Sequence, residues 1–295
     1  MQLTEAGVWA SQLGLVPAPE ARRAAAAIEE LGYGAIWVGE ADGREALTHA
    51  GLLLEATHHL VVATGIANIW ARDAQAMING ARTLAEAHPG RFVLGIGASH
   101  TPLVARRGQT YQRPYAMMRE YLDAMARAGY TSPRPRTEPP VVLAALGPRM
   151  LRLAGERAQG AHTYFVPVEH TRRAREQLGP ESLLAPEQAM VLAADRAAAR
   201  AVAGRHVARY LDLDNYRRNL PRLGWHDDDL ADGGSDRLFD ALVAWGGPEV
   251  VAARVGEHLA AGADHVALHV LTEAPTRLPL LELETLRAAL PRTST

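Results

Sequence analysis

The sequence contains neither cysteine nor lysine, and both absences exclude whole classes of chemistry. Without cysteine the chain can form no disulfide, no thiolate nucleophile and no thiolate metal ligand. All 31 basic residues are arginine, so Schiff-base catalysis, attachment of pyridoxal phosphate and a Walker-type phosphate lysine are excluded as well. Any phosphate that this chain binds has to be held by arginine, by hydroxyl groups or by backbone N–H groups.

The chain also lacks a long apolar run and an excess of charge of one sign. No window reaches the roughly 18 apolar residues of a membrane-spanning helix, and the N-terminus has no signal-peptide pattern. The net charge is −2 over 295 residues, which provides no basic face for nucleic acid or for an anionic membrane. We therefore expect a cytoplasmic protein that binds a small molecule, with no nucleic acid and no membrane as partner.

Residues 60–99 predict a strand, a helix and a second strand. The run 60–68 is largely apolar, Asp73 can cap a helix with apolar residues at helical spacing, and Pro89-Gly90 ends that helix. The run 92–97 is a second buried strand. Two strands joined by a helix lie parallel, with a right-handed crossover, so this stretch is a βαβ unit of an α/β protein.

The same unit repeats along the chain and predicts a barrel. Eight strands are expected, at 7–10, 35–40, 60–68, 92–97, 141–146, 161–168, 188–193 and 264–271. Eight strands alternating with helices indicate a (β/α)8 TIM barrel, and we expect one domain over residues 1–295 because no Pro- or Ser-rich linker divides the chain. Two insertions interrupt the repeat. One follows strand four, beginning as a polar loop, and the other, 195–247, lies between strands seven and eight and includes a helix expected over 236–245.

In a TIM barrel the chemistry takes place where the carboxyl ends of the strands meet. This rule gathers residues that are far apart in sequence around one mouth: Trp9, Glu40, Gly65, Ile66, Asn68, Trp70, Ser99, His100, Gly147 and Tyr164. The aromatic members, Trp9, Trp70 and Tyr164, can form the wall of a substrate pocket or simply belong to the core.

Two side chains at this mouth are predicted to be catalytic. His100 follows the fourth strand, and an imidazole with the ordinary pKa near 6.5 exchanges protons at neutral pH. The alternative is a loop histidine that makes a single hydrogen bond. Glu40 ends the second strand, where its carboxylate can contact a ligand or orient a base, or can cap the following helix.

Two backbone features at the mouth predict ligand binding. Gly65 interrupts the third strand, which usually marks a bulge or a close approach of a ligand, although it can also be a gap in packing. Gly147-Pro148 starts a helix that faces the mouth, and free N–H groups and the helix dipole favour an anion there. Residues 147–150 are therefore the candidate phosphate site, although they also suit an ordinary helix start.

Other motifs are interpreted as structural. Gly95-Ile96-Gly97 is not a dinucleotide fingerprint, because His100 takes the place of the third glycine. His265 and His269 would lie about 13 Å apart on a strand, and no HExxH motif or acidic triad accompanies them. No metal site is predicted.

Five segments carry a resemblance to a known family. They are AIWVGE (35–40), TGIANIWARDAQAM (64–77), HPGRFVLGIGASH (88–100), LGPRMLRLAGERAQG (146–160) and GADHVALHV (262–270). Together they resemble the bacterial luciferase-like (β/α)8 superfamily and, more closely, its coenzyme F420-dependent oxidoreductases of the actinobacterial type.

The resemblance implies a cofactor site. It implies a bulge with a non-prolyl cis peptide at Gly65-Ile66, against which the tricyclic deazaflavin ring rests, and a phosphate at residues 147–150. Glu40, Ser99 and His100 would lie beside the reacting edge of the ring. The residues expected to bind the cofactor are Gly65, Ile66, Asn68, Ser99, Gly147, Pro148, Arg149 and Met150. Relatives are commonly homodimers, with the helices of the 60–99 unit at the contact.

Two differences from the sugar-phosphate dehydrogenases of the superfamily exclude one class of substrate. Its sugar-phosphate dehydrogenases place a catalytic histidine directly after the second strand, where this chain has Ala41, and they bind the substrate phosphate with lysine. Glucose 6-phosphate is therefore not expected. Our hypothesis is an oxidoreductase that transfers a hydride between coenzyme F420 and an unidentified organic substrate. The alternatives are an FMN-dependent monooxygenase of the same fold and a non-catalytic barrel that binds a cofactor or nothing.

Overall fold

The structure is a computed structural model that describes residues 3–290. Its strands are β1 (Ala6–Trp9), β2 (Ala35–Val38), β3 (Val61–Thr64), β4 (Ala67–Asn68), β5 (Phe92–Gly97), β6 (Val141–Ala144), β7 (Gly160–Thr163), β8 (Leu183–Leu192), β9 (Val243–Gly246) and β10 (Val266–Val270). None of the helices in the described part of the chain is long and apolar enough to cross a membrane.

The helices follow the strands in alternation. They are α1 (Ala18–Glu30), α2 (Ala46–Leu54), α3 (Ala74–Ala87), α4 (Thr101–Arg106), α5 (Pro114–Arg127), α6 (Pro148–Arg157), α7 (Val168–Leu178), α8 (Arg196–Leu211), α9 (Asp214–Arg217), α10 (Asp227–Leu230), α11 (Asp236–Leu242), α12 (Pro248–Ala260) and α13 (Leu280–Ala289), with short 3-10 helices η1 (Ser11–Gly14) and η2 (Leu220–Leu223).

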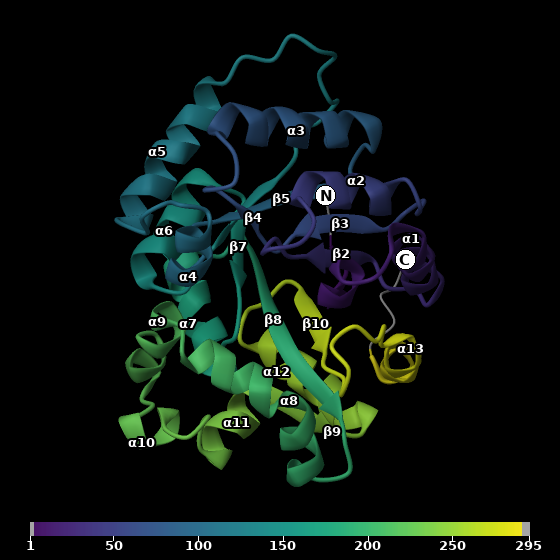
Figure 1. Ribbon diagram of the computed structural model, residues 1–295, viewed down its shortest axis with the longest axis vertical. Helices are drawn as coiled ribbons and strands as arrows, with labels where there is room; N and C mark the ends of the chain where they lie inside the picture. Colours follow the sequence, from purple (N-terminus) through teal and green to yellow (C-terminus); the bar gives the residue numbers. More distant parts are fainter. Residues whose placement is uncertain (1–2, 291–295) are drawn as a thin grey trace.

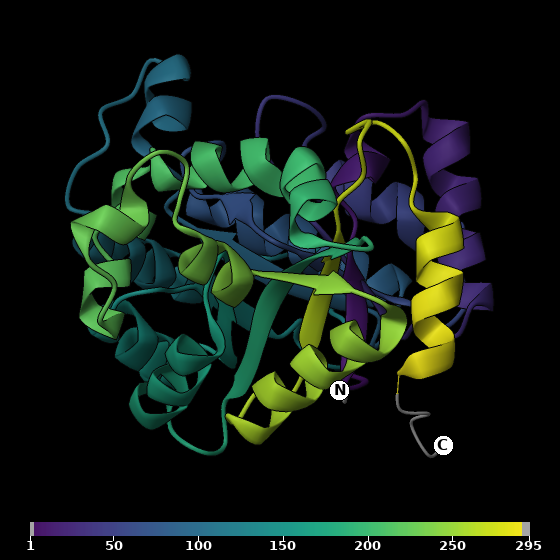
Figure 2. The same ribbon diagram turned by 90° about the horizontal axis from the view of Figure 1, so that it is seen from below.

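Eight of the parallel strands among residues 3–290 close into a barrel, as the sequence predicts. They run in the order β1, β2, β3, β5, β6, β7, β8 and β10, and β10 pairs with both β8 and β1, which closes the ring. The helices α2, α3, α5 and α6 lie outside the strands (Figure 1). The first and last helices, α1 and α13, lie side by side (Figure 2).

The third strand is interrupted at Gly65, where the sequence predicts an interruption. It consists of β3 and β4, separated by a cis peptide bond between Gly65 and Ile66. The Thr64 hydroxyl donates to the Gly95 carbonyl oxygen at 2.7 Å and accepts from the Gly95 N–H at 2.8 Å. This side chain replaces backbone pairing, so the chain can leave the β3–β5 ladder and rejoin β5 through Ala67.

The predicted start of the seventh barrel strand is wrong. It predicts 188–193, whereas β8 begins at Leu183 and is ten residues long. The sequence pattern does not indicate a strand at 186–188, because proline and buried polar residues are unusual in β-strands. The polar side chains there are nevertheless buried, since Glu187 and Gln188 are each 1% exposed.

The two insertions are present, but two predictions within them are wrong. Residues 236–245 are not one helix: α11 ends at Leu242, and β9 pairs with residues 189–192 of β8. A neighbouring strand and the β-prone Val243 decide the structure there. The polar loop after strand four contains α4, which begins after His100 with Pro102 in its first turn, where a missing N–H costs little.

Candidate active site

A cavity of about 900 Å³ opens where the barrel strands end at their carboxyl sides. The insertion between β8 and β10 forms part of its wall through residues of α8, α9 and η2. Figure 2 shows α8, in green, lying across the ends of the strands. The predicted mouth residues that line this cavity are Trp9, Glu40, Gly65, Ile66, Ser99, His100, Gly147, Met150 and Tyr164.

The other predicted residues lie around the cavity without lining it. Asn68 is buried, and its side-chain oxygen accepts a hydrogen bond from the Trp70 N–H at 3.0 Å. The Trp70 indole N–H donates to the Ala98 carbonyl oxygen at 2.9 Å, which ties the region after β4 to the end of β5. Pro148 and Arg149 start α6, and the Arg149 guanidinium stacks 4.3 Å from the centre of the Tyr115 ring.

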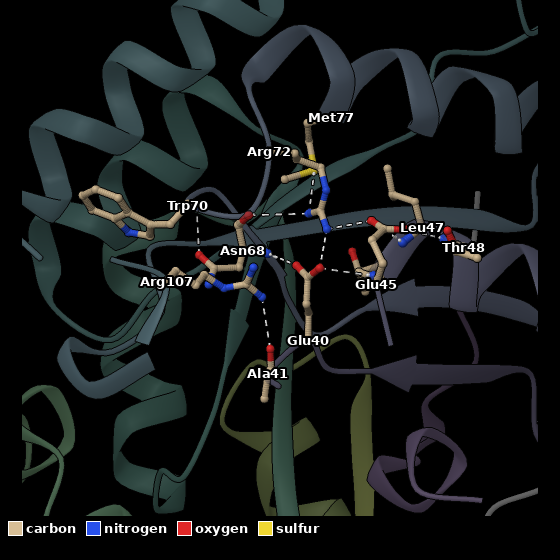
Figure 3. A network of polar contacts seen from close by, with 12 residues as sticks. Glu40, Ala41, Glu45, Leu47, Thr48, Asn68, Trp70, Arg72, Met77 and Arg107 are labelled. Carbon is tan, nitrogen blue, oxygen red and sulfur yellow. Dashed lines mark hydrogen bonds and ion pairs between the residues drawn. The ribbon is translucent and has the colours of Figure 1, made fainter. Parts of the chain in front are cut away.

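Glu40 holds the end of β2 against β4 (Figure 3). Its carboxylate accepts from the Asn68 N–H at 2.7 Å and from the Ala46 N–H at 3.3 Å, and it forms an ion pair with Arg72. Arg72 also pairs with Glu45, at 2.6 Å. With these donors around it, the Glu40 carboxylate fixes the backbone beside Gly65.

His100 is part of the cavity wall and contacts the insertion. It is the residue before α4, and its Nδ1 lies 3.2 Å from the side-chain oxygen of Asn215. Burial lowers the pKa of His100 below 6.5, and the nearby positive charge of Arg209 lowers it further, against the hydrogen bond to Asn215, which raises it. The imidazole is therefore largely neutral at neutral pH.

A cluster of polar side chains at the cavity was missed by the sequence analysis. Glu187 on β8 and His269 on β10 are 1% and 4% exposed, and the Glu187 Oε1 lies 2.9 Å from the His269 Nδ1. His206 on α8 stands 5.2 Å from His269, ring centre to ring centre. The sequence signal for this cluster is Glu187, an acidic residue in a largely apolar run, but Pro186 beside it argues against a strand there.

These three residues also form a set that could bind a metal ion. Glu187, His206 and His269 each offer one ligand atom, and these atoms lie within 4.8 Å of one another. Two histidines and a carboxylate are a ligand set that several divalent metals accept. The sequence pattern pairs His269 only with His265, and no metal site is predicted from it.

Two buried ring nitrogens at the bottom of the cavity have no hydrogen-bond partner among residues 3–290. They are the Trp9 Nε1, which can only donate, and the His162 Nε2. The His162 Nδ1 lies 2.8 Å from the Ala185 carbonyl oxygen, so it carries the proton and leaves the Nε2 as an acceptor. Burial lowers the pKa of His162 to about 4, so it is neutral at neutral pH. A Cβ added to Gly65 would lie 3.0 Å from the Trp9 Nε1 and 3.4 Å from the His162 Nε2.

An anion-binding feature lies at the start of α6. Gly147 caps the helix and lines the cavity together with Met150, so the positive end of the helix dipole lies at the cavity wall. Pro148 has no N–H, and the Met150 N–H bonds to the Gly147 carbonyl oxygen at 3.1 Å, so the dipole contributes more here than free N–H groups do. The Arg222 Nη1, which comes from η2 in the insertion, lies 2.9 Å from the position of a Cβ added to Gly147. The Arg222 guanidinium makes no hydrogen bond or ion pair within the described part of the chain.

With this geometry established, comparison with known proteins decides the family. The family model for luciferase-like monooxygenases matches residues 2–265. The chain belongs to the luciferase-like monooxygenase family. The luciferase-like TIM barrel expected from the sequence is thereby confirmed.

Relatives of this luciferase-like chain differ in the cofactors that they are named for. A Mycobacterium tuberculosis protein, named as an inferred coenzyme F420-dependent oxidoreductase, is 30% identical over 170 residues, which is 57% of this chain and 46% of that protein. This chain thus spans less than half the length of that relative. The structure of an F420-dependent secondary alcohol dehydrogenase with an F420–acetone adduct superposes with a TM-score of 0.77 at 16% identity, over 99% of both chains.

An FMN-containing luciferase-like structure is also similar. It is the oxygenating constituent of the 3,6-diketocamphane monooxygenase of Pseudomonas putida, with a TM-score of 0.72 at 17% identity over 97% of this chain and 96% of that one. At these identities both superpositions establish the fold. They do not choose between the two cofactors.

Proposed function

We propose that this luciferase-like protein is an oxidoreductase that transfers a hydride between coenzyme F420 and an organic substrate. The observation that carries the proposal is the stretch of main chain at Gly65 and Ile66 that lines the cavity, with Gly39 beside it. Glycine leaves the backbone accessible, and a planar ring can lie against it. The F420-related names among the relatives favour the deazaflavin over FMN.

The residues around this wall fit a deazaflavin in two ways. The pyrimidine edge of such a ring offers carbonyl oxygens and an N–H group, which complement the unpartnered donor of Trp9 and the unpartnered acceptor of His162. The phosphate of the cofactor tail suits the N-terminus of α6, where Arg222 adds a positive charge. FMN has both features as well, so the fit supports either cofactor and binding has to be measured.

When bound, the cofactor supplies or accepts a hydride at C5 of its ring. The protein orients the ring, excludes water and handles the accompanying proton. Of the two residues predicted for the proton, Glu40 is surrounded by Arg72 and two backbone N–H groups, so we assign it the task of positioning the backbone at Gly65. His100 stays a candidate for the proton, because it lines the cavity and, within residues 3–290, its ring makes one hydrogen bond, to Asn215. His269 also lines the cavity and is the second candidate.

The proposal is tested by titrating the purified protein with coenzyme F420 and, separately, with FMN, while following cofactor fluorescence. We expect saturable binding of F420 that is tighter than the binding of FMN. Tighter FMN binding together with oxygen uptake by the reduced flavin would support a monooxygenase instead. If neither cofactor binds, the redox assignment fails and the non-catalytic barrel is favoured.

A pair of glycine variants ties binding to the proposed wall. In Gly65→Ala the added methyl group would stand 3.0 Å from the Trp9 Nε1, in the space where the ring edge is proposed to bind, so we expect weaker binding of F420. Gly43→Ala is the matched control, since Gly43 also lines the cavity but its added methyl group would meet only a backbone oxygen at 4.0 Å. A homodimer and a cytoplasmic location remain further parts of the proposal.

A further inference from the structure

The geometry points to Glu187 and His269 as an acid–base pair, in which His269 exchanges a proton with the substrate and Glu187 positions its ring. This inference rests on the proposed function and deepens it, because it names both the group that handles the proton and the substrate class. His269 lines the cavity, whereas Glu187 lies behind it, one strand away on β8. A histidine that faces a cavity with a buried carboxylate at its back is the arrangement used to orient a general acid or base.

The surroundings of Glu187 fix the tautomer of His269. One carboxylate oxygen contacts the His269 Nδ1 at 2.9 Å, and the other accepts the Phe165 N–H at 3.1 Å. Glu187 makes no ion pair with arginine within residues 3–290, and the side-chain nitrogen that contacts this buried carboxylate is the His269 Nδ1. The Nδ1 must donate to the carboxylate, which leaves the Nε2 as the site of proton exchange.

The opposite edge of the His269 ring faces groups that can lead a proton to a substrate. The Nε2 lies 3.2 Å from the Ser11 hydroxyl, and Ser11 lines the cavity. The His269 ring also packs against Trp9, with the ring centres 4.7 Å apart, which holds it in place. The Nε2 and the Ser11 hydroxyl therefore form a short polar path at the cavity.

Other titratable groups face His269, and most are held neutral. Burial lowers the pKa of His206 well below 6.5, and the charges of His269 and Arg209 add to this effect. Burial raises the pKa values of Tyr164 and Tyr210, and the Tyr164 hydroxyl lies 3.3 Å from the His269 Nδ1. Glu187 is thus the carboxylate that contacts His269, and the positive charge of Arg209 acts on the neighbouring His206 and Tyr210.

An imidazole oriented by a carboxylate at the cavity suits a substrate with a carbonyl group or, in the reverse direction, a hydroxyl group, because hydride addition to carbon leaves an oxygen that needs a proton. In reduction the carbonyl carbon receives the hydride with its electron pair, the C=O π bond breaks, and the oxygen takes the proton from the His269 Nε2. His269 then returns from imidazolium to neutral imidazole. In oxidation the alcohol proton goes to the Nε2 as the hydride leaves the carbon. Such a step needs a proton carrier at the oxygen, which is the task that this pair can perform.

The first test is nuclear magnetic resonance on the full-length protein labelled with 15N-histidine. We expect the His269 signals, assigned by their absence in His269→Gln, to show the tautomer protonated at Nδ1 in the wild-type protein, and to lose this preference in Glu187→Gln. His226→Gln removes an exposed histidine outside the cavity and should leave the His269 signals unchanged. A wild-type His269 protonated at Nε2 would overturn the proposal without any variant.

The second test uses acetone and 2-propanol as probes, with reduced and oxidised coenzyme F420. Removal of a general acid or base costs on the order of 100-fold or more in kcat/KM, and we expect this loss in His269→Gln with the Kd for F420 unchanged. In Glu187→Gln the pH profile of kcat/KM should move to lower pH, because the imidazolium has lost its carboxylate. If kcat/KM fell in His100→Ala but stayed at the wild-type value in His269→Gln, the proposal would be overturned.

The two proposals fail in different ways. Absence of F420 binding removes the proposed function, whereas F420 binding together with an unchanged pH profile in Glu187→Gln removes only the acid–base pair.

A metal-based alternative is tested on the same samples. One tightly bound divalent ion per wild-type chain, lost in His206→Ala, would assign Glu187, His206 and His269 as ligands and would overturn the proton-transfer role. We expect no such stoichiometric ion.

Discussion

Glu40 shows how a residue predicted for chemistry can act through structure. Its side chain is 3% exposed and its partner Arg72 is 10% exposed, so this ion pair is almost completely removed from water. Removing one partner of a buried pair typically costs about 3 to 5 kcal/mol, because the other charge is left uncompensated. Since Arg72 retains Glu45, we expect the lower value, about 3 kcal/mol, for Glu40→Gln in urea unfolding.

The matched control for this prediction is Glu138→Gln. Glu138 also binds an arginine, Arg82, at 2.9 Å, but it is 51% exposed. Exposed pairs contribute about 1 kcal/mol or less, so this variant should be nearly as stable as the wild type. Equal losses of stability in the two variants would contradict the role assigned to Glu40. We also expect weaker F420 binding in Glu40→Gln alone, because the carboxylate fixes the Asn68 backbone beside Gly65.

At the same scale, the sequence predicted which single residues lie at the cavity, but not which side chains contact one another there. Strand ends identified Trp9 and His100 at the cavity, because the apolar pattern alone indicates where these strands end. Tyr164 lines the cavity as well, but the strand predicted over 161–168 is wrong at its end, since β7 ends at Thr163. The contact between Glu187 and His269 depends on the register in which β8 and β10 pair, which no local pattern encodes. The same holds for Arg222, which approaches Gly147 only because the insertion folds back over the barrel.

At the scale of elements, the junction of β3 and β5 depends on Gly95. A Cβ added there would lie 1.8 Å from the Thr64 carbonyl oxygen, so either strand would have to move. Overpacking typically costs about 1 to 3 kcal/mol, and because the clash is with backbone we expect Gly95→Ala to lose about 3 kcal/mol in urea unfolding. The Thr64 hydroxyl that bridges the junction would be displaced with it.

Gly204→Ala is the control, and it should change stability in the opposite direction. Gly204 lies within α8, and a Cβ added there meets nothing within 4 Å. Replacing glycine by alanine inside a helix stabilises it by about 0.5 to 1 kcal/mol. If Gly95→Ala were as stable as Gly204→Ala, the close approach of β3 to β5 would not exist in solution.

The insertion and the barrel meet at the proposed phosphate site, which gives a prediction about binding. Loss of a charge-assisted hydrogen bond costs about 1.5 to 3 kcal/mol, which corresponds to a roughly 10- to 100-fold increase in Kd. We therefore expect Arg222→Gln to weaken the binding of coenzyme F420 by this factor, measured by fluorescence titration. The same variant should bind the phosphate-free deazaflavin riboside as the wild type does.

Arg217→Gln is the matched control for this experiment. Arg217 belongs to α9 in the same insertion and is exposed, but it does not line the cavity. F420 affinity should be unchanged in this variant. Equal weakening of F420 and of the phosphate-free compound in Arg222→Gln would indicate that Arg222 acts on the ring or on folding instead of on the phosphate.

Most helices and strands were predictable from the sequence. The wrong predictions concern segments whose structure depends on neighbouring elements. The cap of α3 was correctly predicted, since Asp73 accepts the Ala76 N–H at 2.9 Å, a local interaction. β9 was missed because its residues continue the apolar pattern of α11, and only the adjacent β8 makes them a strand. Tertiary pairing decided the structure of this segment against its helical pattern.

At the scale of the whole molecule, the barrel was predictable because it depends on a count. Eight alternating units with parallel strands leave few arrangements other than a closed barrel, and the pairing of β10 with β1 completes it. The functional cavity was less predictable, because much of its wall comes from the insertion between β8 and β10. Loops and short helices of this kind are placed by tertiary contacts alone.

The barrel also buries several histidines, which makes the stability of the whole molecule depend on pH. Burial lowers the pKa values of His49, His162 and His265 to about 4 and that of His258 to about 3. In the unfolded chain each of these histidines has a pKa near 6.5. Between pH 6.5 and about 4 the unfolded chain therefore binds more protons than the folded one, so the free energy of unfolding falls as the pH falls through this range.

We expect the free energy of unfolding, measured in urea, to be lower at pH 5 than at pH 7 by about 2 kcal/mol for each such histidine, which gives several kcal/mol in total. Carboxylates contribute mainly below their unfolded pKa values near 4, so this interval isolates the histidines. His258→Gln should reduce the difference by about one histidine's share, because its contacts with Thr171 and Gln188 are polar but the amide does not titrate. Equal stability of the wild type at pH 7 and pH 5 would contradict burial of neutral histidines. Since a typical domain has only about 5 to 15 kcal/mol of stability, a loss of this size should bring the protein close to unfolding at pH 5.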